Sequence, residues 1–441
     1  MRILLLAYAF PPLATPQALR WYYFSRELAA RGHDVHVLAP DLVVDEAESI
    51  EVPRGVTVHR CSPGGLTAQI HQHRRRRQDA RALEPAPALV AAAAGATENG
   101  AELNWKGRLH RNIDSSLSYF MYPDSTSQWL PPARAQLQRL LPYLRPDVLI
   151  GSHEPAGVLQ LALDVRGDTP WIADLGDPVL ASYTPARWRR KAQALEARVC
   201  READHVIVTT EATRSCLMHR HATSAQRIAV VPQGFDACGP TRRTNAGTGA
   251  QPDLNLFYGG RFYPFRDPGA LIEAVLSVSG VRLHVATPEL APAIRRMCQA
   301  NPEKIELLGR LTHTATRSLQ QSHDVLVNIG NRSPEQTPGK LFEYFGAFRP
   351  ILHLSSGEHD PAEDLLLRHS RGWSCANEPA AIAEVLRQLV QRKRAGRLDD
   401  DLDLGLETVA AYQWRTLGGE IDRLLQRVAG YAGQRRHTSS A

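Results

Sequence analysis

The sequence has few cysteines and no long apolar run. The six cysteines are scattered and none forms a Cys-x-x-Cys pair, which argues against a zinc site and against a disulfide framework; they are Cys61, Cys200, Cys216, Cys238, Cys298 and Cys375. The apolar run at the start ends at Pro11 and Pro12, and it is shorter than the ~20 residues that a membrane-spanning helix needs. We therefore expect isolated thiols in a cytoplasmic protein without a membrane span.

The charge balance is mildly positive and excludes little. Lys and Arg together number 52 and Asp and Glu 46, which gives a formal net charge of +6. Such an excess suits anionic ligands such as phosphates, anionic lipid or nucleic acid, and it does not choose among them. A chain of 441 residues exceeds what one hydrophobic core usually holds, so we expect two domains.

Apolar strands alternate with helical stretches along most of the chain. We predict strands at 2–9, 35–38, 56–58, 147–151, 171–173, 205–208, 228–231, 254–258, 282–286, 305–308, 325–329 and 351–354. We predict helices at 16–31, 132–144, 155–165, 186–203, 268–278, 289–299 and 340–347. Because parallel strands need helical crossovers, this alternation predicts a doubly wound α/β domain in each half of the chain.

Two segments interrupt the alternation. Residues 61–115 contain the run Arg74-Arg75-Arg76-Arg77 and read as a basic insertion in a first domain, 1–236. Residues 237–253 have the Gly, Thr and Pro content of a linker to a second domain, 254–406. Helical periodicity returns at 407–430, and the polar residues 431–441 are expected to form a disordered tail.

Two arginines follow the first strand of the second half. Gly259 and Gly260 end that strand and allow the backbone to turn tightly and approach a ligand. Arg261 and Arg266 then lie on the loop, and the guanidinium group matches phosphate oxygens with paired donors. The loop is either a phosphate site or a solvated turn, and its place after a buried strand favours the phosphate site.

A second string combines a helix start with opposite charges. Pro338 and Gly339 stand where a helix would begin, with Lys340 next and Glu343 about one turn further on. Free backbone N–H groups at a helix start and a lysine suit a diphosphate. A carboxylate at Glu343 suits sugar or ribose hydroxyls, although such a glutamate is also common as a solvated or capping residue.

Together these strings resemble glycosyltransferase family 4, whose members have the GT-B fold. In the second half of the chain, the resemblance rests on Gly-Gly-Arg-x4-Arg from Gly259, Glu335-x7-Glu343 with Pro-Gly-Lys-Leu-Phe-Glu-Tyr, and Arg349-Pro350-Ile351-Leu352. In the first half, it rests on Phe10-Pro11-Pro12 with Arg20, Arg31-Gly32-His33-Asp34, Pro146–His153, Trp171–Pro178, Ala203–Val208 and Val231–Asp236. The resemblance implies two Rossmann-like domains facing each other across a cleft, with the 407–430 helix crossing back to the first domain.

The resemblance also implies roles for individual residues. Arg261 and Arg266 would hold the donor diphosphate, helped by Lys340 and the backbone near Gly339. Glu343 would bind the donor ribose, and Glu335 would contact the transferred sugar. Gly309 would lie by the nucleotide base, and Gly260 would form part of the loop that binds the donor. The family usually has lysine at the position of Arg266, and the glutamate of its sugar contact usually precedes Gly-Phe-Gly, which Glu335 does not.

In the first half, the resemblance places His153 near the reacting carbon or the phosphate. A histidine after a strand is otherwise a hydrogen-bonded structural residue. Arg20, Asp174 and Asp177 are candidates for the acceptor side, and the two aspartates alternatively cap the next helix.

We therefore expect a retaining glycosyltransferase that moves a sugar from a nucleotide-sugar donor to a glycan, a lipid-linked sugar or a small molecule. We expect no metal, no other cofactor and no nucleic-acid partner, because no recognition motif accompanies the basic run. Arg74, Arg75, Arg76 and Arg77 form either a solvated face or a peripheral contact with anionic lipid at the inner face of the membrane. The alternatives are a nucleotide-sugar epimerase or phosphorylase of the same fold, and a scaffold that binds nucleotide sugars without turnover.

Overall fold

The computed structural model divides the chain into two compact units. It describes residues 1–44, 49–65, 67–69, 71, 121–237, 253–263, 266–331, 336–357 and 360–439. One unit comprises Met1–Ile207 and Leu425–Ala441, and the other comprises Val208–Leu424. Residues 72–115 of the expected insertion and 238–252 of the expected linker lie outside the described residues.

The first unit is built on a seven-stranded sheet with the strand order β3-β2-β1-β4-β5-β6-β7. Its strands are β1 Arg2–Leu6, β2 Asp34–Pro40, β3 Val56–Cys61, β4 Val148–Ser152, β5 Trp171–Leu175, β6 His205–Val208 and β7 Ile228–Val230. The helices that accompany them are α1 Pro16–Ala30, α4 Leu130–Leu144, α5 Gly157–Val165, α6 Arg189–Glu202 and α7 Glu211–His221. Short 3-10 helices lie at η2 Ser125–Trp129, η3 Ala186–Trp188 and η4 Ala225–Arg227. The division into units assigns 208–236 to the second unit, but β7 hydrogen-bonds in this sheet and is described with it.

Helix α1 shows how local sequence sets the ends of an element. The side chain of Thr15 caps its start by accepting the backbone N–H of Ala18, and Pro16 occupies the first turn, where no N–H is needed. At the other end, Gly32 adopts a φ of +83° and donates its N–H to the carbonyl of Ala29. The predicted helix and its glycine stop are thus confirmed.

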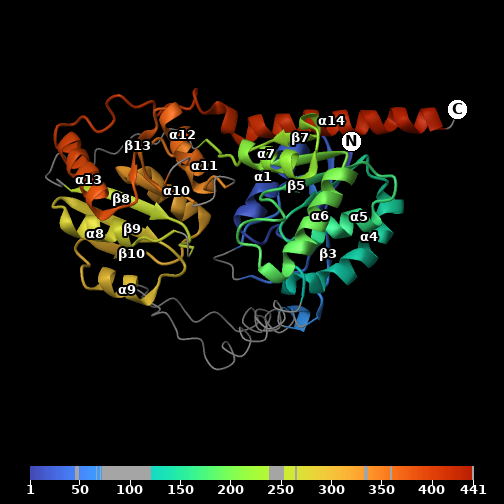
Figure 1. Ribbon diagram of the computed structural model, residues 1–441, viewed down its shortest axis with the longest axis horizontal. Helices are drawn as coiled ribbons and strands as arrows, with labels where there is room; N and C mark the ends of the chain where they lie inside the picture. Colours follow the sequence, from blue (N-terminus) through green and yellow to red (C-terminus); the bar gives the residue numbers. More distant parts are fainter. Residues whose placement is uncertain are drawn as a thin grey trace, which may run out of the picture. The chain divides into compact units, whose positions relative to one another are not determined.

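The second unit is built on a six-stranded sheet with the order β10-β9-β8-β11-β12-β13. Its strands are β8 Leu254–Gly259, β9 Val281–Ala286, β10 Ile305–Leu307, β11 Val325–Ile329, β12 Ile351–Ser355 and β13 Gly372–Ala376. Its helices are α8 Gly269–Ser277, α9 Pro292–Gln299, α10 His313–Ser322, α11 Gly339–Phe345, α12 Pro361–Arg368 and α13 Pro379–Arg394, followed by η5 Ala410–Tyr412 and by α14 Trp414–Ser439. Figure 1 shows this unit from yellow to red along the chain.

Alternate residues of β8 enter two different cores, as expected for a sheet covered on both faces. Leu254, Leu256 and Tyr258 pack with apolar side chains of α8 and α13, which lie side by side on one face (Figure 1). Phe257 belongs to the opposite core, with residues of α11 and α12. The loops at the carboxyl ends of the strands therefore start from a rigid two-faced layer.

Most predicted elements are present within a few residues of their predicted bounds. We did not predict β13, α7, α10, α12 or α13. The C-terminal helix α14 runs to Ser439, so it continues through most of the segment that we expected to be a disordered tail.

Candidate functional site

Each sheet reverses its strand order at one place. In the second unit the reversal lies between β8 and β11, and in the first unit between β1 and β4. In open α/β sheets, ligands bind beyond the carboxyl ends of the strands at such a switch point, because the crossovers leave the sheet on opposite faces there. The residues that follow these four strands are therefore the candidates for each unit.

The two strings that we singled out in the second half meet at this switch point. A Cβ built on Gly260 would lie 3.9 Å from Cγ of Lys340, although the two residues are far apart in sequence. The N–H of Gly259 donates to the hydroxyl of Tyr344 at 3.3 Å, which ties the end of β8 to α11. Arg261 is exposed beside these residues.

Arg266 is held by a side chain that follows β11. Its Nε donates to Oδ1 of Asn331 at 2.7 Å, and its guanidinium carbon lies 5.5 Å from the centre of the Tyr263 ring. Burial raises the pKa of Tyr258 to about 12, against the opposing effect of the Arg266 charge nearby. The loops after β8 and β11 are thus joined by a fixed cation.

Lys340 and Glu343 form an ion pair on α11. Nζ of Lys340 lies 2.7 Å from Oε2 of Glu343, and the two side chains are 30% and 23% exposed. Burial acts to raise the pKa of Glu343, but the charge of Lys340 and its hydrogen bond to the carboxylate help to outweigh it, and the pKa is lowered. Glu343 is therefore a carboxylate at neutral pH, available to accept hydrogen bonds from hydroxyl groups.

The structure describes two of the three remaining predicted donor residues. Gly309 follows β10 with a φ of +68°, and no heavy atom of the part of the chain that the structure describes lies within 4 Å of a Cβ built there. Gly339 is the first residue of α11, and a Cβ there would contact only Gln233. Glu335 lies outside the described residues.

Arg20 and Asp174 form a buried ion pair in the first unit. Nε and Nη2 of Arg20 donate to the two carboxylate oxygens of Asp174 at 3.1 and 3.0 Å. Nε1 of Trp21 donates to the same carboxylate at 2.7 Å, and the side chains of Arg20 and Asp174 are 3% and 1% exposed. Asp174 therefore ties β5 to α1 and does not cap the next helix.

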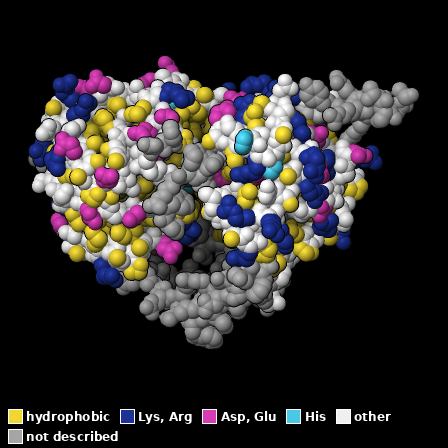
Figure 2. Space-filling model, viewed as in Figure 1, with side chains coloured by type: hydrophobic (Ala, Val, Ile, Leu, Met, Phe, Trp, Pro, Cys, Tyr) yellow, Lys and Arg dark blue, Asp and Glu magenta, His cyan; other side chains and the backbone are white. Residues whose placement is uncertain are grey.

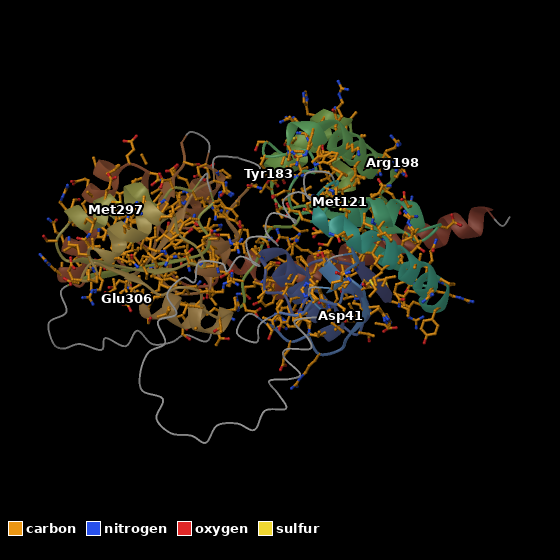
Figure 3. All side chains as sticks on the ribbon, turned by 90° about the horizontal axis from the view of Figure 1, so that it is seen from below. Asp41, Met121, Tyr183, Arg198, Met297 and Glu306 are labelled. Carbon is orange, nitrogen blue, oxygen red and sulfur yellow. The ribbon has the colours of Figure 1, made fainter. Side chains whose placement is uncertain are left out.

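His153 and Asp177 lie in a polar group at the first unit's switch point. Nδ1 of His153, a residue that is 7% exposed, lies 3.1 Å from the carbonyl oxygen of Asp177. The hydroxyl of Tyr183 donates to Oδ2 of Asp177 at 3.0 Å, and Tyr183 is 52% exposed (Figure 3). Glu154 accepts from Nε2 of Gln17 at 3.0 Å and lies 3.5 Å from the hydroxyl of Tyr183. Two carboxylates and a phenol thus converge beside the histidine.

The predictions missed several residues of these two groups. Asn331 and Glu154 come directly or almost directly after buried strands, and this position could have identified them. Gln17, Tyr183 and His313 lie elsewhere, and no pattern in the sequence indicates that they belong to the site.

The predicted basic run Arg74–Arg77 lies outside the described residues. Figure 2 shows many Lys and Arg side chains on the part of the first unit where Figure 1 draws α4, α5 and α6. Exposed cations of α6 include Arg189, Arg190 and Lys191. Within the described ranges, no helix is long and apolar enough to span a bilayer, and no three His, Cys, Asp or Glu side chains are grouped as metal ligands would be.

Part of the first half matches a known protein family. Residues 89–237 match the model of Glycosyltransferase Family 4. No curated protein matches the chain by sequence. The matched segment ends just after β7, and it contains His153, Asp174 and Asp177.

Solved structures resemble nearly the whole chain. Sucrose-phosphate synthase from Thermosynechococcus elongatus is 13% identical, with 98% of this chain and 100% of that chain covered and a TM-score of 0.66. Anabaena HepE in complex with UDP-glucose is 13% identical, with 97% and 100% covered and a TM-score of 0.61. A variant of S. aureus TarM in complex with UDP, α-GlcNAc-glycerol and fondaparinux is 11% identical, with 96% and 99% covered and a TM-score of 0.60. The chain thus has the GT-B fold of two Rossmann-like units and resembles glycosyltransferase family 4.

Proposed function

We propose that this chain is a glycosyltransferase whose second unit binds a nucleotide-sugar donor and whose first unit binds the acceptor. The observation that carries the proposal is the meeting of Gly260, Arg266, Lys340 and Glu343 at the switch point between β8 and β11. The family match in the first unit and the fold of both units support it. Two of the similar structures were solved with UDP or a UDP-sugar, which favours a nucleoside diphosphate as the ligand of this edge.

The side chains of the second unit suit a leaving group that gains negative charge. When the bond from the sugar C1 to the diphosphate oxygen breaks, charge grows on the diphosphate. Arg261, Arg266 and Lys340 would stabilise that charge, and the loss of one such fixed donor typically costs about 2.7–4 kcal/mol in the transition state. Helix α11 has seven residues, so we assign this role to the cationic side chains rather than to its dipole. We propose that these cations act without a divalent metal, and unchanged turnover in EDTA is the expected result.

We further propose that transfer retains the configuration at C1. In this scheme the acceptor oxygen bonds to C1 on the face that the diphosphate leaves, and the hydroxyl proton passes to the departing phosphate oxygen. We assign Glu343 to the donor ribose and the Glu335 position to the transferred sugar. Product anomers from a turnover reaction, resolved by NMR, test the stereochemistry.

For the acceptor we propose the polar group of the first unit. His153, Glu154, Asp177 and Tyr183 present oxygen and nitrogen atoms of the kind that hydrogen-bond to hydroxyl-rich molecules. Arg20 and Asp174 are buried and bonded to each other, so we assign them to positioning β5 and α1 rather than to contact with the acceptor. The acceptor would be a glycan, a lipid-linked sugar or a small hydroxylated molecule.

A lipid-linked acceptor would suit a peripheral contact with anionic membranes. In the part of the chain that the structure describes, the exposed cations Arg189, Arg190 and Lys191 support such a contact. The run Arg74–Arg77 is the second group of cations that we predict to take part in it. Sedimentation with vesicles containing anionic lipid, compared with neutral vesicles, tests it.

The experiment that tests the donor site is a thermal-shift screen with UDP, GDP, dTDP and ADP and their sugars. We expect one nucleotide to raise the unfolding temperature, because a ligand that binds only the folded protein stabilises it by about 2.7 kcal/mol at one hundred times its dissociation constant. Arg261→Ala should abolish the shift, whereas Arg387→Ala, at an exposed arginine of α13, should keep it. If no nucleotide shifts the wild-type protein, the donor site is wrongly assigned. Binding without turnover would favour a scaffold, and a C2-epimerised product an epimerase.

A further inference from the structure

We propose that Asn331 is a positioning residue for the donor phosphate site and acts through Arg266. The inference rests on the proposed function, because it assigns a partner to one of the cations that would bind the diphosphate. The hydrogen bond from Nε of Arg266 to Oδ1 of Asn331, at 2.7 Å, fixes the guanidinium along one edge. The two terminal nitrogens of the same planar group carry the remaining N–H donors and are the ones that match phosphate oxygens.

Asn331 is itself fixed at three atoms. Besides accepting from Arg266, it donates from Nδ2 to the carbonyl of Gln336 at 3.1 Å. Its own carbonyl oxygen accepts a hydrogen bond from Oγ of Ser356. Asn331 is only 7% exposed, so these bonds are shielded from water, and the side chain has a single defined orientation.

A buried network extends from Ser356 into the sheet. The N–H of Ser356 donates to Oδ2 of Asp360 at 3.2 Å, and Nε2 of His353 lies 2.9 Å from the same oxygen. Nδ1 of His353 lies 2.8 Å from Nδ2 of Asn328. Because an amide nitrogen only donates, Nδ1 accepts, and the hydrogen on Nε2 points at Asp360. His353 is thus hydrogen-bonded at both ring nitrogens, to Asn328 and to Asp360.

The network joins the elements that end at the phosphate site. Asn328 belongs to β11 and His353 to β12, while Asp360 caps α12 by accepting the N–H of Ala362 at 2.9 Å. The side chains of His353 and Asp360 are 0% and 1% exposed. A buried polar network of this kind makes the elements that it joins rigid when its members are hydrogen-bonded. Its value here is geometric, since it sets where the loops after β11 and β12 leave the sheet and hence where Asn331 meets Arg266.

The pairing also requires an arginine. A lysine at position 266 has one nitrogen at its tip and cannot bond to Asn331 from the side while it presents a planar pair of donors to phosphate. Arg266→Lys is therefore expected to lose the benefit of Asn331 although it keeps the charge.

A double-mutant cycle tests the proposal, with UDP and inorganic pyrophosphate as the probes and calorimetry as the measurement. We expect Arg266→Ala and Asn331→Ala each to weaken binding by about tenfold or more, as is typical when a hydrogen bond of a charged group is lost. The double variant should bind no more weakly than Arg266→Ala alone, because Asn331 acts through Arg266. Asn255→Ala, at a residue of β8 outside the network, serves as the control and should bind like the wild type.

Two results would overturn the proposal, and they have different meanings. If Arg266→Ala weakens binding but Asn331→Ala does not, or if their effects add in the double variant, Asn331 has no positioning role and the donor site stands. If Arg266→Ala itself binds both probes like the wild type, the phosphate site and the positioning role both fail. Should Asn331→Ala not fold, Asn331→Ser replaces it in the cycle. The shorter serine side chain removes the amide oxygen that accepts from Nε and adds no charge, so it should weaken binding of both probes only while Arg266 is present.

Discussion

Glu343 lies within hydrogen-bond distance of Lys340 one helical turn away, and both side chains remain partly exposed. Such a pair contributes little to the stability of the protein, because solvent screens it. The pair does fix the positions of one negative and one positive group beside each other at the switch point. A donor with a diphosphate at one end and a ribose at the other presents the complementary order, with an anion for Lys340 and hydroxyl groups for Glu343.

We predict that Glu343→Gln weakens UDP binding at pH 7 by about tenfold, because a charged acceptor is lost from the proposed ribose site. The lowered pKa of Glu343 means that its contribution to stability is present above the pKa of an unfolded glutamate and is lost as the pH falls through the folded value. The variant should therefore lose less stability than the wild type on acidification. Calorimetry with UDP and thermal unfolding at several pH values measure the two effects.

Glu384→Gln is the matched control, because Glu384, at an exposed position of α13, also pairs with a cation three residues away, Arg387. It should leave UDP binding unchanged. Equal weakening by the two variants would show that the loss reflects overall charge rather than a contact at Glu343.

At this scale, the sequence predicts what lies close along the chain and little else. The Lys340–Glu343 pair follows from a spacing of one helical turn. Asn331 could not be assigned to Arg266, nor Asp174 to Arg20, because only the folded sheet brings these pairs together. For Asp174 we left a helix cap open as the alternative to an acceptor contact, and this alternative was wrong, since buried donors on α1 take up both carboxylate oxygens.

The strands illustrate the same limit for whole elements. Strands with continuous apolar residues, such as β1 and β11, were predicted because both faces of a parallel sheet are buried. β13 reads Gly-Trp-Ser-Cys-Ala, and it is an edge strand with partly exposed residues, so its sequence carries no comparable signal. The sixteen residues of α13 have a clear apolar face, and we could have predicted this helix from its periodicity.

We predict that Gly330→Ala destabilises the second unit by about 1–3 kcal/mol, the usual cost of overpacking. A Cβ at this position would lie 2.3 Å from Oδ2 of Asp360, so the turn after β11 can keep its path only if the residue has no side chain. Urea unfolding monitored by circular dichroism measures the change.

Gly430→Ala, in the interior of α14, is the comparison, because among the described residues no heavy atom lies within 4 Å of a Cβ there. This variant should be neutral or more stable by about 0.5–1 kcal/mol, since alanine has the higher helix propensity. Destabilisation of similar size in both variants would rule out the collision with Asp360 as the cause.

Across the whole molecule, several histidines are kept neutral by burial. Burial lowers the pKa of His59, His313, His323 and His369 below the ordinary value of 6.5. The unfolded chain therefore binds more protons than the folded protein between the folded pKa values and 6.5. Stability rises with pH wherever the unfolded state binds more protons, so it falls as the pH is lowered through this window.

We predict that the protein loses stability between pH 7.5 and pH 5.5, and that His323→Gln makes this loss smaller. His323 is 8% exposed, and its Nδ1 lies 2.6 Å from the carbonyl oxygen of Leu319, a bond that the glutamine amide can replace. Unfolding temperatures measured across this range, for wild type and variant in the same buffers, check the prediction. A flat profile in the wild type, or an unchanged slope in the variant, would contradict it.

The first unit is made of two separate stretches of chain, and the second unit lies between them in sequence. The chain returns to the first unit within α14, inside a helix rather than in a loop. Leu425 and Val428, which belong to the closing stretch, are 0% and 6% exposed. On the ribosome, which adds about 5–20 residues per second, this stretch is made roughly 10–45 seconds after Ile207. Until then the nascent first unit lacks a cover for apolar surface, so the yield of intact protein will depend on translation speed and on chaperones as well as on final stability.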